Sequence, residues 1–329
     1  MNTTSSQKGR CVLRAVCFLL ILALILVSLS FLLQPKGNYR SDWIQNPNAR
    51  GFYSEPANCL DILVVGNSDV YSGYSPMELW NAYGYTSYAC AEGAQTLAES
   101  VNILQEALSN QHPKLVILET DAIFYNRKTA TRLNDTTADF IEGKLPVFRY
   151  HNLWKINSPS KMLQPPEYKA HRTTKGQKLD TRVKGYSGKN YWKNHSRDQQ
   201  IPLSSRPFLN QFVRICREND INLLLMEIPS ASSWNETKHN LVKEYADQHN
   251  IPFLDLDRHQ AEFDFDWRTD SRDGGNHLNS QGAKKLTLYL GQYLSQHYDL
   301  ADKRDNAAYD RWNQDYQRYL ERLQKKQST

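Results

Sequence analysis

One short stretch near the C-terminus combines a carboxylate and a histidine at a spacing that suits general-base catalysis. The run Asp273-Gly-Gly-Asn-His277-Leu-Asn-Ser-Gln-Gly282 reads as a glycine-rich loop followed by a helix start. Far upstream, the apolar run Asp61-Ile-Leu-Val-Val-Gly66 leads through an asparagine to Ser68. A serine hydroxyl becomes a good nucleophile only beside a base, and that base needs a partner that fixes its tautomer. Ser68, His277 and Asp273 therefore predict acyl chemistry on a serine, with the order Ser, Asp, His along the chain.

The segments around these residues alternate between short apolar strands and amphipathic helices. We expect strands at 61–65, 86–90, 114–118, 222–226 and 252–256, and helices at 76–83, 95–110, 205–219, 234–250 and 281–297, the last capped by Asn279 or Ser280. Such alternation predicts an α/β fold with a parallel, doubly wound sheet, whose sites lie beyond the carboxyl ends of the strands. Because Ser68, Thr120 and Asp121 each follow a strand, we expect them to meet His277 at one edge.

An apolar segment near the N-terminus is long enough to cross a bilayer. Residues 15–33 are 19 residues without a charge or a proline, which suits a hydrocarbon core of about 30 Å. Lys8, Arg10 and Arg14 precede it and favour a cytoplasmic N-terminus. We predict a cytoplasmic tail at 1–14, a single-pass cell-membrane anchor at 15–33 and an extracytoplasmic body. A cleaved signal peptide is the alternative, but the apolar core is long for one.

The remaining chain divides by composition. Residues 34–58 contain three prolines and predict a stalk, and 59–298 predict the α/β domain with an insertion at 122–205. Residues 299–329 predict an amphipathic helix, whose apolar face is formed by Tyr309, Trp312, Tyr316, Tyr319 and Leu323. We expect that helix to dock on the domain. A dimerising coil and a membrane-lying helix are the alternatives.

The insertion is strongly basic and rich in aromatic residues. Between residues 125 and 191 there are 14 Lys or Arg and 5 Asp or Glu, a local charge of 14 − 5 = +9. Lysine and arginine hold anionic polymers, and sugars stack on aromatic rings, so we expect a basic lip beside the active site. An ordinary solvated face is the alternative. His151, in the stretch Tyr-His-Asn-Leu-Trp, is a candidate substrate contact.

Composition excludes several other classes. The net charge of +5 is mild and no nucleic-acid-binding motif is present, so we expect no nucleic-acid partner. The five cysteines show no zinc spacing with histidine, and the serine mechanism needs neither a metal nor an organic cofactor. Cys59 and Cys90 could form a disulfide if their strands are neighbours. The alternative is that the three cysteines of the body, Cys216 included, are buried free thiols.

The chain resembles the SGNH (GDSL-like) hydrolase-fold family over residues 60–120 and 205–296. Gly66-Asn67-Ser68 stands where the family has its nucleophile, and Asp273–Gly282 stands where it has its Asp/His block. The resemblance is to the membrane-anchored bacterial branch that includes the protein completing D-alanylation of lipoteichoic acid and the alginate O-acetyltransferases. It implies a flavodoxin-like, three-layer parallel sheet. It also implies Ser68 as nucleophile, His277 as base and Asp273 as its orienting partner.

Two departures from the family pattern bear on the chemistry. The family often spaces its pair Asp-x-x-His, whereas three residues separate Asp273 from His277 here, with Asp270 or Asn276 as other orienting candidates. The block that supplies an oxyanion-hole asparagine in many members reads Glu-Thr-Asp at 119–121. We therefore expect the backbone amides of Ser68 and Gly93 as oxyanion donors, with the Thr120 hydroxyl and Asp121 near the substrate.

These observations predict a membrane-tethered, extracytoplasmic serine esterase or O-acyltransferase acting on a cell-envelope polymer, such as a teichoic acid or a polysaccharide. By family analogy, a multipass membrane O-acyltransferase would supply the acyl group. The alternative is a catalytically inactive binding or assembly protein of an envelope-modification complex on the same fold. A third hypothesis is a metal-dependent phosphoesterase that uses four aspartates, Asp61, Asp69, Asp121 and Asp273.

Overall fold

The computed structural model describes residues 3–124, 138, 140–188, 190–193 and 200–328, and the rest of the insertion lies outside the described residues. The chain divides into two compact units, residues 1–44 with 137–169 and residues 45–136 with 170–329. The predicted stalk and insertion are therefore each shared between both units. Burial explains why the second half of the stalk joins the larger unit, since Phe52 is fully buried there and the Arg50 Nε donates to Glu106 Oε2 at 2.7 Å.

The smaller unit contains the apolar N-terminal helix. Helix α1 is Thr3–Leu32, and its segment Gly9–Leu32 has a mean hydropathy of 3.0. It is long and apolar enough to cross a membrane, although a signal sequence would share these properties. The short helices of this unit include η1 (Arg40–Asp42), α7 (Val147–Tyr150), η3 (His151–Lys155) and α8 (Pro159–Met162). The Val147 amide donates to Ser30 Oγ at 3.1 Å, which joins α7 to the end of α1.

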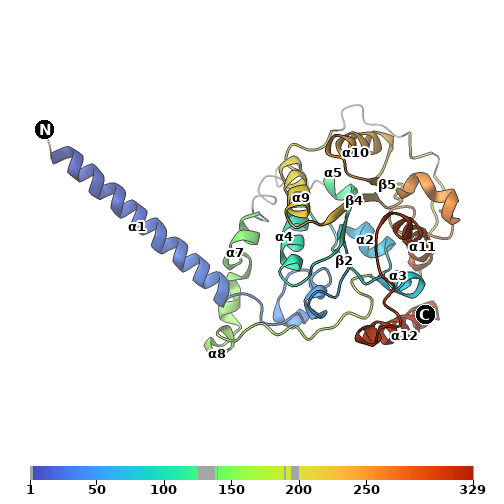
Figure 1. Cartoon of the computed structure of the whole chain (residues 1–329), viewed down its shortest axis with the longest axis horizontal. Helices are drawn as coiled ribbons and strands as arrows, with labels where there is room; N and C mark the ends of the chain where they lie inside the picture. The colour runs from blue at the N-terminus through green and yellow to red at the C-terminus, as the bar shows by residue number, and fades with distance from the viewer. Residues whose placement is uncertain (1–2, 125–137, 139, 189, 194–199, 329) are drawn as a thin grey trace. The chain divides into compact units, whose positions relative to one another are not determined.

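The larger unit is built on a parallel sheet of five strands, as predicted (Figure 1). The strands are β1 (Ile62–Gly66), β2 (Ser87–Ala91), β3 (Leu115–Glu119), β4 (Asn222–Glu227) and β5 (Phe253–Asp255). Their order is β2-β1-β3-β4-β5, which is the flavodoxin-like arrangement. The chain changes direction across the sheet between β1 and β3, so the residues that follow these two strands lie at the switch point where such folds place their sites.

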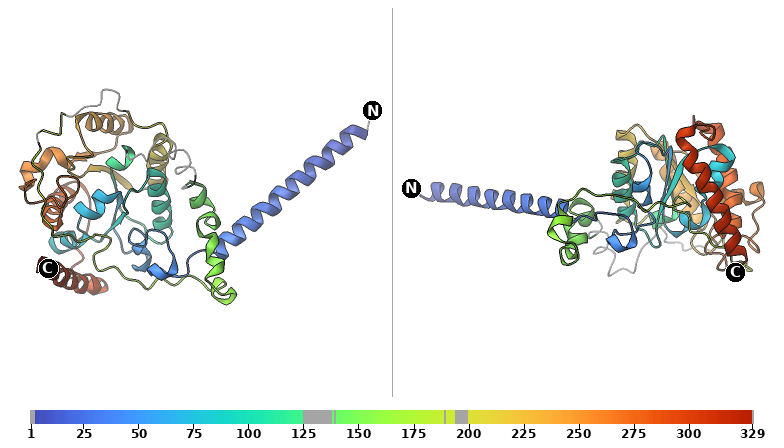
Figure 2. Two further views of the ribbon diagram at one scale, coloured as in Figure 1. Left: turned by 180° about the vertical axis from the view of Figure 1, so that it is seen from behind. Right: turned by 90° about the horizontal axis from the view of Figure 1, so that it is seen from below.

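Helices cover both faces of the sheet (Figures 1 and 2). Alternate strand side chains pack into two separate cores, with Leu63 and Val65 in one and Ile62 and Val64 in the other. The first core takes α4 (Leu97–Leu108), α9 (Arg206–Glu218) and α10 (Glu236–His249). The second takes α2 (Ser68–Gly73), α3 (Pro76–Tyr83) and α11 (Ser280–His297). The larger unit also contains the short helices η2 (Gly51–Ser54), α5 (Asp121–Phe124) and η4 (Leu256–Phe263).

The C-terminal helix docks on this unit, as expected. Helix α12 (Asp310–Gln327) follows η5 (Ala307–Tyr309) and packs on α3. Trp312 and Tyr319 are buried, and Trp312 lies 5.3 Å from Trp80 between ring centroids. The cysteines of the body are buried free thiols, so the Cys59–Cys90 disulfide does not form.

Candidate active site

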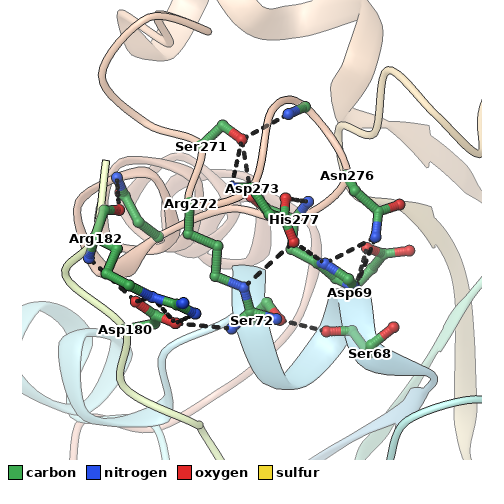
Figure 3. A network of polar contacts seen from close by, with 12 residues as sticks. Ser68, Asp69, Ser72, Asp180, Arg182, Ser271, Arg272, Asp273, Asn276 and His277 are labelled. Atoms are coloured by element: carbon green, nitrogen blue, oxygen red, sulfur yellow. Dashed lines mark hydrogen bonds and ion pairs between the residues drawn. The ribbon is translucent and has the colours of Figure 1, made fainter. Parts of the chain in front are cut away.

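The Asp273–His277 pair forms inside a tight loop directly before α11 (Figure 3). The loop turns through Gly274 and Gly275, whose φ angles of +87° and +98° favour glycine. One Asp273 oxygen accepts the His277 backbone N–H at 2.8 Å, and the other lies 2.5 Å from His277 Nδ1. This double contact fixes the ring and leaves Nε2 as the nitrogen that can act as a base, with the Asn276 side-chain amide 3.4 Å away.

The two other candidates for orienting His277 have different roles. Asp270 is fully buried and pairs with Lys285 at 2.8 Å. The Asn276 amide lies 2.9 Å from His277 Nδ1, but the nearer contact on that nitrogen is Asp273. The helix that follows is capped by Asn279, whose side-chain oxygen accepts the amides of residues 281 and 282. Asp273 is therefore the carboxylate that orients the imidazole.

Burial and pairing act on the pKa values of this pair in opposite directions. Burial lowers the pKa of His277 below its usual value, and the contact with Asp273 opposes only part of that effect. Burial alone would raise the pKa of Asp273, but the hydrogen bonds from His277 outweigh it and hold the pKa below its usual value. At neutral pH, His277 is therefore neutral and Asp273 is ionised, which is the state that general-base catalysis requires.

Ser68 lies where β1 ends and α2 begins. The preceding residue, Asn67, turns its side-chain oxygen to the Asp69 amide at 2.8 Å, which starts the helix at Ser68. Ser68 is half-buried, and its carbonyl accepts the Ser72 hydroxyl at 2.6 Å. Within the described part of the chain, no hydrogen bond joins the Ser68 hydroxyl to His277. Nε2 of His277 instead faces Asp69 Oδ1 at 4.0 Å, so the imidazole reaches the residue directly after Ser68.

The Glu-Thr-Asp block at the end of β3 is internally bonded. The Thr120 hydroxyl is fully buried and donates to Glu227 Oε2 at 2.5 Å. Asp121 accepts Lys238 Nζ at 2.7 Å and the Asn67 side-chain amide at 3.3 Å. Thr120 is therefore engaged away from any substrate, and Asp121 positions the turn that carries Ser68 through Asn67.

Gly93 lies near the site, with its amide already engaged. A Cβ at this position would meet the Tyr71 hydroxyl at 3.6 Å, so Gly93 faces α2. Its N–H donates to Glu92 Oε1 at 3.1 Å. Of the predicted oxyanion donors, the Ser68 backbone amide is therefore the one for which the described residues show no competing acceptor. Glu92 also pairs with Lys178.

Three buried carboxyl groups lie at the start of α2 and at the ends of β3 and β4. Burial raises the pKa of Asp69 well above its usual value, and the charges of Glu119, Asp121 and Asp273 add to the effect. Burial, with the charge of Asp121 next in importance, raises the pKa of Glu119 to about 8. Burial also raises the pKa of Glu227. From the sequence alone, Asp69 could be placed near the site because it directly follows Ser68. Glu119 and Glu227 could not, because each is simply the last residue of an apolar strand.

His151 lies in the smaller unit. It begins η3, is exposed, and places Nδ1 2.9 Å from the Phe148 carbonyl oxygen. The contact with Phe148 holds the His151 ring at the junction of α7 and η3. A contact between His151 and substrate stays a prediction.

The four aspartates of the metal hypothesis do not converge. Asp61 precedes β1, at the amino edge of the sheet, where it pairs with Lys303 and accepts the Thr86 hydroxyl at 3.0 Å. The other three lie at the carboxyl edge. Among the described residues, no group of three or more His, Cys, Asp or Glu side chains is arranged to hold a metal. Asp61 therefore cannot be a ligand of the metal site that the phosphoesterase hypothesis requires.

No family model and no curated protein sequence matches the chain. Among solved structures, it is similar to a protein described as an acylhydrolase from Bacteroides fragilis, with 14% identity over 75% of this chain and 94% of that chain and a TM-score of 0.38. It is also similar to a lipolytic protein of the G-D-S-L family from Desulfitobacterium hafniense, with 14% identity, coverages of 70% and 97% and a TM-score of 0.39. A third similar structure is a lipase/acylhydrolase from Enterococcus faecalis, with 12% identity, coverages of 74% and 98% and a TM-score of 0.39. At such identities and TM-scores, activity has to be inferred from the residues of the site itself.

Proposed function

We propose that the chain is a membrane-tethered serine esterase or O-acyltransferase of the SGNH type. The observation that carries this proposal is the 2.5 Å contact between Asp273 Oδ2 and His277 Nδ1, in a loop that brings the other ring nitrogen to the start of α2. An oriented, neutral imidazole activates a serine hydroxyl that comes within hydrogen-bond reach, and here the imidazole lies at the residue next to the half-buried Ser68.

The proposed reaction has two steps. Ser68 Oγ attacks the acyl carbonyl while its proton passes to His277 Nε2. The bond to the departing alcohol breaks and the alcohol takes that proton, which leaves an acyl ester on Ser68. Water or a glycan hydroxyl then attacks the acyl-enzyme through the same base, and the proton returns to Ser68. The first step requires Nε2 to exchange its contact with Asp69 for the Ser68 hydroxyl.

We infer a cell-envelope polymer as the acceptor or substrate, on the basis of the apolar segment Gly9–Leu32 and the basic insertion. For a transferase, a multipass membrane O-acyltransferase is the proposed acyl donor partner. The anchor would keep the site close to both, with the catalytic domain outside the cytoplasm.

A fluorophosphonate probe tests the serine mechanism directly. We expect labelling of the full chain at Ser68, located by peptide mass spectrometry, and its loss in Ser68→Ala and His277→Ala. Ser295→Ala is the matched control, because Ser295 is an exposed residue of α11 whose hydroxyl donates to the Gln292 carbonyl at 2.8 Å. Labelling that survives Ser68→Ala would exclude this serine as the nucleophile.

A non-catalytic envelope-binding protein is the second candidate. It is favoured by one observation, that His277 Nε2 faces Asp69 and no hydrogen bond joins it to the Ser68 hydroxyl among the described residues. An unlabelled wild type, together with an unchanged cellular phenotype in Ser68→Ala, would support it over the enzyme.

A further inference from the structure

Arg272 is a partly buried cation beside the candidate base. It directly precedes Asp273, and its backbone N–H donates to the His277 carbonyl at 3.1 Å. Its side chain is only 11% exposed. In Figure 3 it points from the Asp/His loop toward α2, which carries Ser68. The backbone of the loop thus fixes the place where the guanidinium sits.

The guanidinium lacks a hydrogen-bond acceptor among the described residues. Its Nε is 3.7 Å from Asp273 Oδ2 and its Nη1 is 3.8 Å from Asp180 Oδ2, both beyond hydrogen-bond length. Each of these carboxylates has a nearer partner at 2.5 Å, His277 for Asp273 and Arg182 for Asp180. The guanidinium thus keeps N–H donors without an acceptor at hydrogen-bond distance, and a planar fork of such donors suits an anion that arrives with the substrate.

A second cation lies on the same aromatic ring. Tyr71 follows Ser68 by three residues on α2, and its ring has Lys178 Nζ at 3.8 Å and Arg272 Cζ at 5.9 Å from its centroid. The Lys178 backbone N–H also donates to the Tyr71 carbonyl at 2.9 Å. Two positive groups are therefore held against the helix that carries the candidate nucleophile, of which Lys178 is also paired with Glu92 and Arg272 has no acceptor at hydrogen-bond distance among the described residues.

The segment that carries Lys178 is fixed to the catalytic loop by backbone hydrogen bonds. The Ser280 N–H donates to the Asp180 carbonyl at 2.7 Å, and the Lys184 N–H donates to the Ser271 carbonyl at 2.9 Å. The Gly274 N–H donates back to the Lys184 carbonyl at 2.8 Å. This part of the basic insertion is thereby built into the wall of the site.

We propose that Arg272, assisted by Lys178, binds an oxyanion of the substrate, a phosphate or a carboxylate, next to Ser68. The planar fork accepts two oxygens of such a group at once, and charge-assisted bonds of this kind are stronger than neutral ones. The assignment deepens the proposed function and rests on it for the statement that the anion belongs to an acyl substrate.

Arg272 also acts on His277, since its positive charge lowers the pKa of the imidazole, after burial as the main cause. A purely electrostatic role would be preserved by lysine at this position. Bidentate binding would not, because an ammonium lacks the planar fork. The pair Arg272→Lys and Arg272→Gln therefore separates binding from charge.

Calorimetry on the full chain in detergent, with inorganic phosphate and with succinate, tests the site without reference to catalysis. We expect wild type to bind at least one of them, and both Arg272 variants to weaken that binding by about tenfold or more. Arg268→Gln is the control, since Arg268 is exposed on the same loop and bonds Asp266; its binding should equal wild type. Comparison of the two ligands distinguishes a phosphate site from a carboxylate site.

Absence of binding by wild type, or binding that survives Arg272→Gln, would overturn the proposal. The catalytic arm compares p-nitrophenyl butyrate with mono-p-nitrophenyl succinate, which carries an additional carboxylate. We expect kcat/KM to favour the anionic ester by about tenfold in wild type and in Arg268→Gln, but not in either Arg272 variant. Ser68-dependent hydrolysis of both esters at equal rates would contradict only the anion site. Loss of Ser68 dependence would contradict the esterase itself.

Discussion

Asp69 Oδ1 lies 4.0 Å from Nε2 of His277, on the side of the imidazole where the nucleophile of a serine enzyme must stand. The two groups come from different elements, α2 and the loop before α11, which pack on each other. Burial raises the pKa of Asp69, which favours the uncharged form of this carboxyl group over the ionised form. A neutral group can give way to the Ser68 hydroxyl more readily than an ion pair can.

Asp69→Asn should therefore stabilise the protein at neutral pH. A pKa that is raised on folding means that the folded state holds a proton that the unfolded state has lost, so wild-type stability falls as pH rises above the unfolded value of about 4. Asparagine removes that loss and keeps the size of the side chain. We expect the melting temperature of Asp69→Asn to exceed that of wild type by a few degrees at pH 7, and the difference to vanish near pH 4. A lower melting temperature at pH 7 would show that Asp69 is ionised and paired.

The pH dependence of activity should have one acidic limb set by His277. The base acts only when neutral, and burial lowers its pKa below 6.5. Activity is then lost as pH falls through that lowered value and is constant around pH 7. Profiles of kcat/KM for p-nitrophenyl acetate between pH 4 and 8 measure this, and a midpoint above 6.5 would contradict the buried, neutral imidazole.

Asp273→Asn should lower kcat by about 10²- to 10⁴-fold, because an amide stabilises the wrong tautomer and does not stabilise the imidazolium. Asp270→Asn serves as the comparison, since Asp270 pairs with Lys285 and not with His277. It should reduce stability more than it reduces turnover of the folded fraction. Equal kcat losses in the two variants would mean that the orienting carboxylate has been misassigned.

Much of this architecture could be predicted from the sequence because its signals are local. The five strands are short apolar runs, and each begins or ends within two residues of its predicted bounds. Asp273 and His277 are four residues apart in a loop with two glycines, so their contact needs only local geometry. The docking of α12 follows in the same way from its apolar face.

The rest depends on contacts between distant segments. Asp69 lies close to His277 because α2 packs on α11, and no local sequence pattern predicts how these two helices are aligned. The Thr120 hydroxyl donates to Glu227 because β3 and β4 are neighbouring strands whose ends bring the two residues together. The segment around Lys178 and Lys184 shows no period because its backbone bonds to loops. It could be assigned to the insertion of the domain, but the loops that it contacts could not be predicted.

A buried lysine joins the C-terminal helix to the rest of its unit. Lys175 Nζ is fully buried and donates to Glu55 Oε1 and to Asp315 Oδ2, each at 2.8 Å. Lys175→Met would leave the carboxylates without this cation and should cost about 3–5 kcal/mol of unfolding free energy. Lys243→Met, which removes an exposed pair with Asp247 on α10, should cost less than about 0.5 kcal/mol. Urea unfolding measures both, and equal costs would contradict the role of Lys175.

The same cluster should make the docking of α12 depend on pH through His171. Burial would lower the pKa of His171, but its contacts with Asp315 and Glu55 outweigh burial and raise the pKa above 6.5. A raised histidine pKa stabilises the folded state fully below the unfolded value, and this stability is lost as pH rises through the folded value. The pKa values of Glu55 and Asp315 are lowered, against the effect of burial, by Lys175 and His171, so their contribution is present above about pH 4 and lost in acid. We expect limited proteolysis to release α12 more slowly at pH 5.5 than at pH 8 in wild type. His171→Asn should abolish that difference, and a wild type cleaved at the same rate at both pH values would contradict the coupling.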